Sequence, residues 1–132
     1  MRIFGNSVRF AVYAPPHGMA FPEYLNLWQR AEVLNYDASY LTDHFVTASE
    51  WSGPETSIFE GPTLLSAMAA HTSRMRCGIN VIGNTFRNPA IVANIASTID
   101  HVSNGRLELG LGAAHVQIPL TRLSTQALKL AS

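Results

Sequence analysis

The 132-residue sequence has one cysteine, no excess of either charge and no long apolar run. Because Cys77 is alone, it cannot form an intrachain disulfide, which favours a reducing compartment. Nine basic residues balance nine acidic ones, so charge provides no attraction for nucleic acid or an anionic membrane surface. No stretch approaches the roughly 18 apolar residues that span a bilayer, and the start lacks the apolar segment of a signal peptide. These absences predict a cytoplasmic protein with no nucleic-acid partner and no membrane segment.

The sequence does contain a regular alternation of short apolar runs and amphipathic segments. Apolar residues make up 47% of the chain, which is enough for the core of one domain. Strands are predicted to begin near Val8, Ala38, Arg76 and Arg106, at steps of about 30–38 residues, and a helix is predicted between each pair. This order, β-α-β-α-β-α-β, is typical of an α/β fold with a parallel sheet.

The three predicted helices have recognisable starts, stops and apolar stripes. Pro22, Pro62 and Pro89 stand at their starts, while Asn35 and Gly105 are predicted to end the first and third. The stripes predicted to face the core are Leu27, Ala31 and Leu34 in the first helix, with Leu25 and Trp28 beside them, Leu64, Leu65, Met68 and Ala69 in the second, and Ile91, Ile95, Ile99 and Val102 in the third.

Two architectures fit this order. One is an open doubly wound sheet, and the other is the first half of a (β/α)8 barrel of TIM type, which takes about 250 residues when whole. Periodicity does not distinguish them, but both bind ligands at the carboxyl ends of the strands. Those ends carry the sequences APPHG, TDHF, GNTFRN and GAAHVQ.

Three histidines lie at these strand ends: His17, His44 and His115. A histidine beside Asp43, as His44 is, has the chemistry to transfer protons near neutral pH. From the pattern alone, a turn-capping aspartate and an ordinary polar histidine are favoured over that interpretation. A metal site is disfavoured because the sequence has no H-x-H, H-E-x-x-H or Cys/His cluster. GLGAAH is not a dinucleotide fingerprint, because His115 stands where the third glycine belongs.

Three segments together resemble the luciferase-like monooxygenase superfamily, most closely its members that use the deazaflavin coenzyme F-420 (F420). They are the tryptophan-bearing first helix, LNYDASYLTDHF, and TSRMRCGINVIGNTFRNPAIVANIASTIDHVSNGRLELGLGAA. The resemblance implies a (β/α)8 barrel of which this chain supplies the first four βα units. It also implies an oxidoreductase in which a hydride passes between an F420 or FMN ring and a small organic substrate, and in which flavin members can go on to activate oxygen. The substrate is left open.

The resemblance implies roles for particular residues. Asp43 and His44 match the family's catalytic Asp-His pair, with the histidine as proton donor or acceptor near the ring. The Asn80–Val81 bond matches a non-proline cis peptide behind the ring. The other positions matched to the cofactor site are Gly83, Asn84, Ala113 and His115.

A half-barrel has consequences for stability and partners. We expect residues 1–115 to form the half-barrel and residues 116–132 a divergent tail. Four strands leave the first and fourth unpaired and an inner face with apolar side chains exposed to water. The chain is therefore predicted to be inactive or weakly active alone, or to pair with a second copy or a complementing half-barrel. The alternative is a non-catalytic remnant or interaction module that binds no cofactor.

Overall fold

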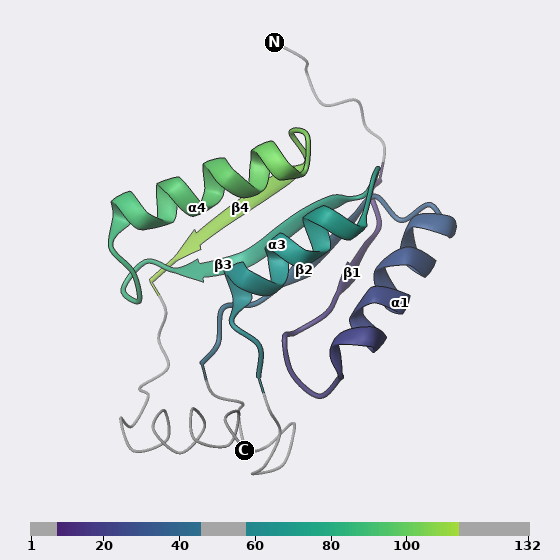
Figure 1. Ribbon diagram of the computed structural model, residues 1–132, viewed down its shortest axis with the longest axis horizontal. Coiled ribbons are helices and arrows are strands. Elements are labelled where there is room, and N and C mark those ends of the chain that lie inside the picture. The colour runs from purple at the N-terminus through teal and green to yellow at the C-terminus, as the bar shows by residue number, and fades with distance from the viewer. Residues whose placement is uncertain (1–7, 46–57, 114–132) are drawn as a thin grey trace.

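The computed structural model describes residues 8–45 and 58–113, which form four strands and three helices (Figure 1). Neighbouring strands are all parallel, and their order in the sheet is the order in the chain, β1-β2-β3-β4. The elements are β1 (Ala11–Tyr13), α1 (Phe21–Val33), β2 (Ala38–Leu41), α3 (Gly61–His71), β3 (Arg76–Gly83), α4 (Pro89–Val102) and β4 (Leu107–Gly112).

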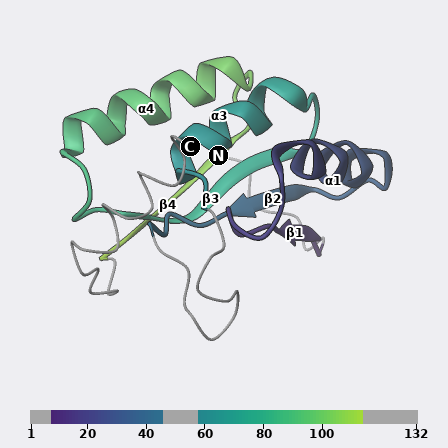
Figure 2. The same cartoon turned by 60° about the horizontal axis from the view of Figure 1, so that its bottom comes forward.

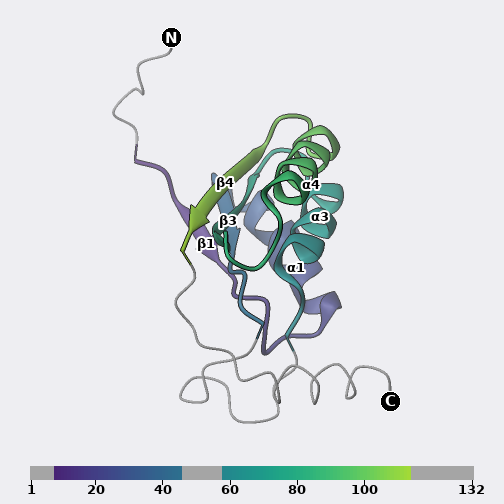
Figure 3. The ribbon, with the colours of Figure 1, turned by 90° about the vertical axis from the view of Figure 1, so that its left-hand side faces the viewer.

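This strand order decides between the two predicted architectures. A doubly wound sheet reverses its order at a switch point and carries helices on both faces, whereas a barrel adds each strand beside the last. Here the order is sequential, and α1, α3 and α4 all cover the same face of the sheet (Figures 2 and 3). The prediction of the first four strands of a TIM-type barrel, alternating with helices, is confirmed.

The helices begin and end with local hydrogen bonds. Glu60 accepts from the Thr63 N–H (2.7 Å) at the start of α3, and Asn88 accepts from the Ala90 N–H (2.9 Å) at the start of α4. Asn35 follows α1 with φ 61°, and Gly105 follows α4 with φ 77°, so both predicted stops adopt the left-handed conformation. None of the described helices is both long and apolar enough to cross a membrane.

Two predicted stripes were partly wrong. In α1 the buried side chains are Tyr24, Trp28 and Ala31, and Leu34 lies beyond the helix with 66% of its surface exposed. In α4 the buried pair is Val92 and Ile99. The two ends of the predicted α4 stripe, Ile91 (54% exposed) and Val102 (50% exposed), face away from the core. All four predicted residues of α3 are buried, as expected: Leu64, Leu65, Met68 and Ala69.

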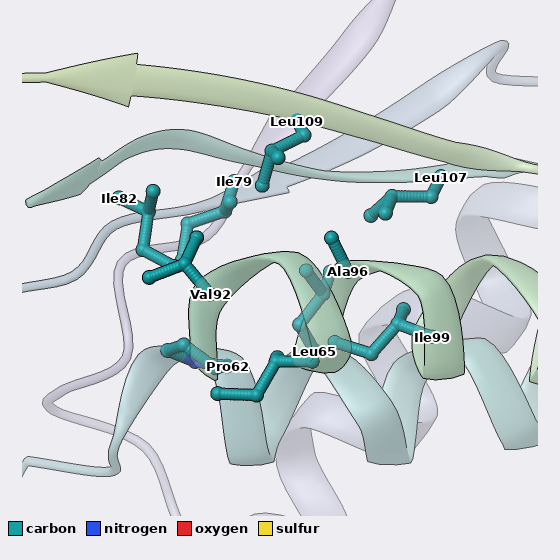
Figure 4. Close-up of a pocket in the computed structure, with 10 residues that line it drawn as sticks. Pro62, Leu65, Ile79, Ile82, Val92, Ala96, Ile99, Leu107 and Leu109 are labelled. Atoms are coloured by element: carbon teal, nitrogen blue, oxygen red, sulfur yellow. The ribbon is translucent and has the colours of Figure 1, made fainter. Parts of the chain in front are cut away.

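The core lies between the helices and the sheet. It contains one small cavity of about 10 Å³ with an apolar lining (Figure 4), contributed by Pro62, Leu65, Ile79, Ile82, Val92, Ile95, Ala96, Ile99, Leu107 and Leu109. That volume is near the smallest that holds one water molecule. A cofactor therefore has no room there, which leaves the bare face and the strand ends as places where one could bind.

The bare face of the sheet carries a cluster of charged side chains. Successive side chains of a strand point to opposite faces, so Tyr40 and Glu108 point away from the helix-covered core. The Glu108 carboxylate accepts hydrogen bonds from Tyr40, from Arg9 (2.9 Å) and from Arg76. A charged cluster therefore crosses the strands on the face that was expected to expose apolar side chains.

Gly78 makes room for this cluster, because the Tyr40 ring lies across it. A Cβ atom on Gly78 would lie 2.5 Å from the Tyr40 ring and 3.0 Å from the Glu108 carbonyl oxygen. We expect Gly78→Ala to lower the free energy of unfolding by about 1–3 kcal/mol, the usual cost of overpacking. Urea unfolding followed by circular dichroism measures this. Gly78→Ala combined with Tyr40→Ala should recover part of the loss, and no recovery would contradict the explanation.

Candidate functional site

The carboxyl ends of all four strands meet at one edge of the sheet. Gly83 is in register with Gly112, and the Asn84 N–H donates to the Gly112 carbonyl (2.9 Å), which joins the ends of β3 and β4. After β1, His17 forms an antiparallel bridge with Ile58, just before α3. Residues distant in the sequence are thus gathered at the edge where ligands bind in parallel α/β folds.

Asp43 is buried at this edge, and its carboxylate binds two other segments. One oxygen accepts from the Gly83 N–H (3.0 Å) and from Arg87 Nη1, and the other accepts from Arg87 Nη2 at 2.8 Å. The Asp43 side chain is only 1% exposed. With both oxygens engaged, Asp43 links the end of β2 to the end of β3 and is an anchor of the loop.

Arg87 is bound by a second carboxylate, that of Glu60 at the start of α3. Burial opposes its charge, but the hydrogen bonds to Asp43 and Glu60 outweigh this and raise the pKa of Arg87 above its ordinary value. Burial likewise opposes the charge of Glu60, but hydrogen bonds from Thr63 and Arg87 hold the pKa of Glu60 below its ordinary value. Arg87 therefore stays charged and ties three segments together.

His44 follows Asp43 directly and is exposed. It lies close enough to His17 to influence its titration, since burial and then the positive charge of His44 lower the pKa of His17. The structure thus brings together two of the three strand-end histidines, while His115 lies outside the described residues. Within the described ranges, no group of three His, Cys, Asp or Glu side chains is arranged to hold a metal ion.

Asn80 and Val81 lie in a bulge of β3, where three steps along β3 match two along β4. Their peptide bond is cis, as the resemblance implied, and both residues are exposed. A Cβ atom on Gly112 would lie 2.3 Å from a Val81 methyl group, and one on Gly110 would lie 3.0 Å from the other. The two glycines of β4 therefore let Val81 spread across the sheet as a low apolar surface.

The other described positions predicted for the cofactor, Gly83, Asn84 and Ala113, lie at the ends of β3 and β4. Gly83 is buried and donates to Asp43, whereas Asn84 is exposed beside the end of β4. Ala113 is exposed, and its carbonyl oxygen lies 3.5 Å from the Thr85 hydroxyl. The tail boundary at residues 115–116 is outside the described residues and stays a prediction.

Sequence reasoning missed Arg87 and Glu60. The sequence did contain a signal for the pairing of Arg87 with Asp43. Arg87 follows β3 and Asp43 follows the neighbouring parallel strand, so the two opposite charges could be expected to lie close together at one edge of the sheet. The aromatic neighbours were also missed: Phe45 packs on Phe86 with 4.6 Å between ring centroids, and the Arg87 guanidinium lies 5.4 Å above the Phe45 ring.

The lowered pKa of Glu60 predicts acid sensitivity. A carboxylate with a depressed folded-state pKa stabilises the fold above its ordinary pKa of 4.5, and this contribution is lost as the pH falls through the folded value. We expect the melting temperature of the chain to fall between about pH 5 and about pH 3. Glu60→Gln should have a lower melting temperature at pH 7 and a shallower fall in acid. A Glu60→Gln profile parallel to that of the wild type at every pH would contradict this.

Comparison with known proteins decides the family. The model of the family described as "Luciferase-like monooxygenase" matches residues 4–126. This chain belongs to the luciferase-like monooxygenase family.

Individual relatives of this luciferase-like chain carry several chemistries. An F420-dependent glucose-6-phosphate dehydrogenase of Amycolatopsis mediterranei is 35% identical over 64% of this chain and 25% of its own length. The 4-hydroxyprotoasukamycin monooxygenase of Streptomyces nodosus is 32% identical over 80% of this chain and 29% of its own. The FMN-bound oxygenating constituent of 3,6-diketocamphane monooxygenase from Pseudomonas putida shares the fold, with a TM-score of 0.62 and 16% identity over 83% of this chain and 30% of its own. The chain thus spans less than a third of each of these proteins.

Proposed function

We propose that this chain contributes the hydride-transfer site of an oxidoreductase that uses an F420 or FMN ring and acts on a small organic substrate. The observation that carries the proposal is the low apolar surface of Val81 over Gly110 and Gly112, at the same end of the sheet as His44. A planar ring fits such a surface, because no Cβ atom rises beside Val81. The printed names of the relatives, one F420-dependent and one bound to FMN, support the choice of ring.

When bound, the ring accepts or releases the hydride, and the chain's own residues do the rest. His44 is exposed at the rim and in our proposal donates or accepts the proton that accompanies the hydride at the substrate. Asp43, buried and bound by Arg87, holds the backbone of that loop. Asn80 in the bulge and Asn84 just after β3 are both exposed and would offer amide groups to a polar edge of the ring.

The buried Thr42 hydroxyl also fits a bound polar group. Thr42 is 5% exposed, and its Oγ1 atom has no hydrogen-bond partner among the described residues. A buried hydroxyl without a partner costs free energy that a ligand oxygen or nitrogen can recover.

Ring binding is tested by titrating FMN and F420 into the full chain and following the fluorescence of each ring. We expect saturable binding by the wild type. Val81→Asp should weaken it about tenfold or more, because a charge on the apolar surface must be desolvated under the ring. Val33→Asp, a matched change at a valine that is 80% exposed at the end of α1, should bind like the wild type.

The same titration examines the alternative of a non-catalytic half-barrel. A cooperatively folded wild-type sample that binds neither ring would overturn the proposal and favour the interaction module. Equal weakening by Val81→Asp and Val33→Asp would show that the ring binds elsewhere.

A further inference from the structure

We infer that Arg87 is the positioning residue for His44, because it holds the residue on each side of that histidine. This inference rests on the proposed function, in which His44 transfers the proton. It adds a residue that neither the resemblance nor the family match assigns to the site.

The first hold is on Asp43. Its two carboxylate oxygens both accept from the Arg87 guanidinium, the two-point geometry that fixes the orientation of a carboxylate as well as its position. The Gly83 N–H adds a third donor from β3. Since the Asp43 side chain is 1% exposed, water does not compete for these bonds, and the backbone that enters His44 is fixed.

The second hold is on Phe45. The Arg87 guanidinium lies over the Phe45 ring at 5.4 Å, in the range of a cation–π contact, and Phe86 packs against the same ring. Phe45 is half-buried as a result. One guanidinium thus contacts both neighbours of His44, and the exposed imidazole between them has a fixed backbone on either side.

Arg87 is itself held by Glu60, which also caps α3 through the Thr63 N–H. This third contact fixes the guanidinium relative to a helix of the scaffold. Lysine cannot reproduce the arrangement, since an ammonium group lacks the planar fork that reaches two carboxylates and stacks on a ring.

The test follows the imidazole directly. The full chain is labelled with 13C at the histidine ring, and its five histidine signals are assigned by single substitutions, beginning with His44→Ala. We expect Arg87→Gln to shift and broaden the His44 signal while the signals of His71 and His101, on helices away from the site, stay in place. Arg76→Gln is the matched control, because it breaks an arginine–carboxylate pair with Glu108 at the opposite end of the sheet. It should leave the His44 signal unmoved.

Adding FMN and F420 to the same samples extends the test to function. In the wild type the ring should perturb the His44 signal, and in Arg87→Gln this ring-induced shift should differ, because the imidazole no longer holds the same position relative to the ring. Arg87→Lys keeps the positive charge but loses the two-point contact, so it should still shift the His44 signal. Such a shift would show that the orientation of the guanidinium matters and not only its charge. Should Arg87→Gln fail to fold, Arg87→Lys and Glu60→Gln carry the same readout.

The outcomes separate the two claims. A folded Arg87→Gln or Arg87→Lys with an unmoved His44 signal overturns the positioning role, whether or not the ring binds. A His44 signal that responds to Arg87 but to neither ring supports positioning and overturns the proposed function. Equal ring-induced shifts in the wild type and Arg87→Gln overturn positioning while the proposed function stands.

Discussion

Replacing Arg106 with Met should lower the free energy of unfolding by about 3–5 kcal/mol, a large share of the total stability of a small domain. The guanidinium donates to the carbonyl oxygens of Ala69 (2.8 Å), Thr72 (2.9 Å), Met75 (2.7 Å) and Ser103 (2.6 Å). Two of these carbonyls lie at the end of α3, where helix carbonyls have no partner within the helix. Met fills the space but leaves these acceptors without a donor.

Thermal and urea unfolding of Arg106→Met measure this loss. Two other substitutions test whether the loss comes from the carbonyl contacts of Arg106. Arg106→Lys should be intermediate, because one ammonium group reaches fewer carbonyls. Arg76→Met removes an arginine whose side chain is 38% exposed and whose partner Glu108 keeps Arg9 and Tyr40, so it should cost about 1 kcal/mol or less. Equal losses for Arg106→Met and Arg76→Met would contradict the capping role.

The sequence predicted the element order because the necessary signals are local. A proline near each helix start and a left-handed residue at Asn35 or Gly105 act on the adjacent backbone, whatever the rest of the chain does. The capping role of Arg106 has no such signal, since three of its four carbonyl acceptors lie 31 to 37 residues away, in α3 and the segment after it. The same is true of the strand order, which only the assembled sheet reveals.

The buried face of α4 shows why periodicity can select the wrong residues. This helix is apolar on two adjacent sides, and stripes through Ile91 or through Val92 both recur at helical spacing. The choice depends on how the helix is rotated against β3 and β4, which is tertiary information. The stripe of α3 was predicted correctly because its large apolar side chains, Leu64, Leu65 and Met68, recur at helical spacing and are all buried.

The site could be predicted to the level of strand ends but not of individual contacts. The strand-end pattern named His44 and the resemblance named Val81, and both roles stay predictions. The cis bond at Asn80–Val81 confirmed one implication of the resemblance. The anchoring of Asp43 by Arg87 depends on the register of two parallel strands, and a shift of one residue would separate the charges. The sequence pattern therefore identified the strand-end edge of the sheet, whereas the contacts between side chains at that edge depend on the strand register.

Two copies of this chain should associate, because the sheet has two open edges in the described part of the chain. The outer edges of β1 and β4 pair with no described strand, which leaves backbone donors and acceptors available. Exposed apolar side chains accompany both edges: Phe10 (66%) precedes β1, and Leu109 (40%) and Leu111 (61%) lie on β4. We propose that two copies join β4 of each to β1 of the other, since two sets of four parallel strands make the eight that close a barrel.

Size-exclusion chromatography with light scattering should therefore find about twice the 14.4 kDa of one copy. Leu111→Asp should shift the chain to the single copy by weakening association about thirtyfold or more, the effect of a charge at the centre of an apolar interface. Ala70→Asp adds the same charge on the exposed side of the central helix α3 and should leave the mass doubled. A sharply melting wild-type monomer would refute the pairing, because it would show that these edges and their leucines are stable in water.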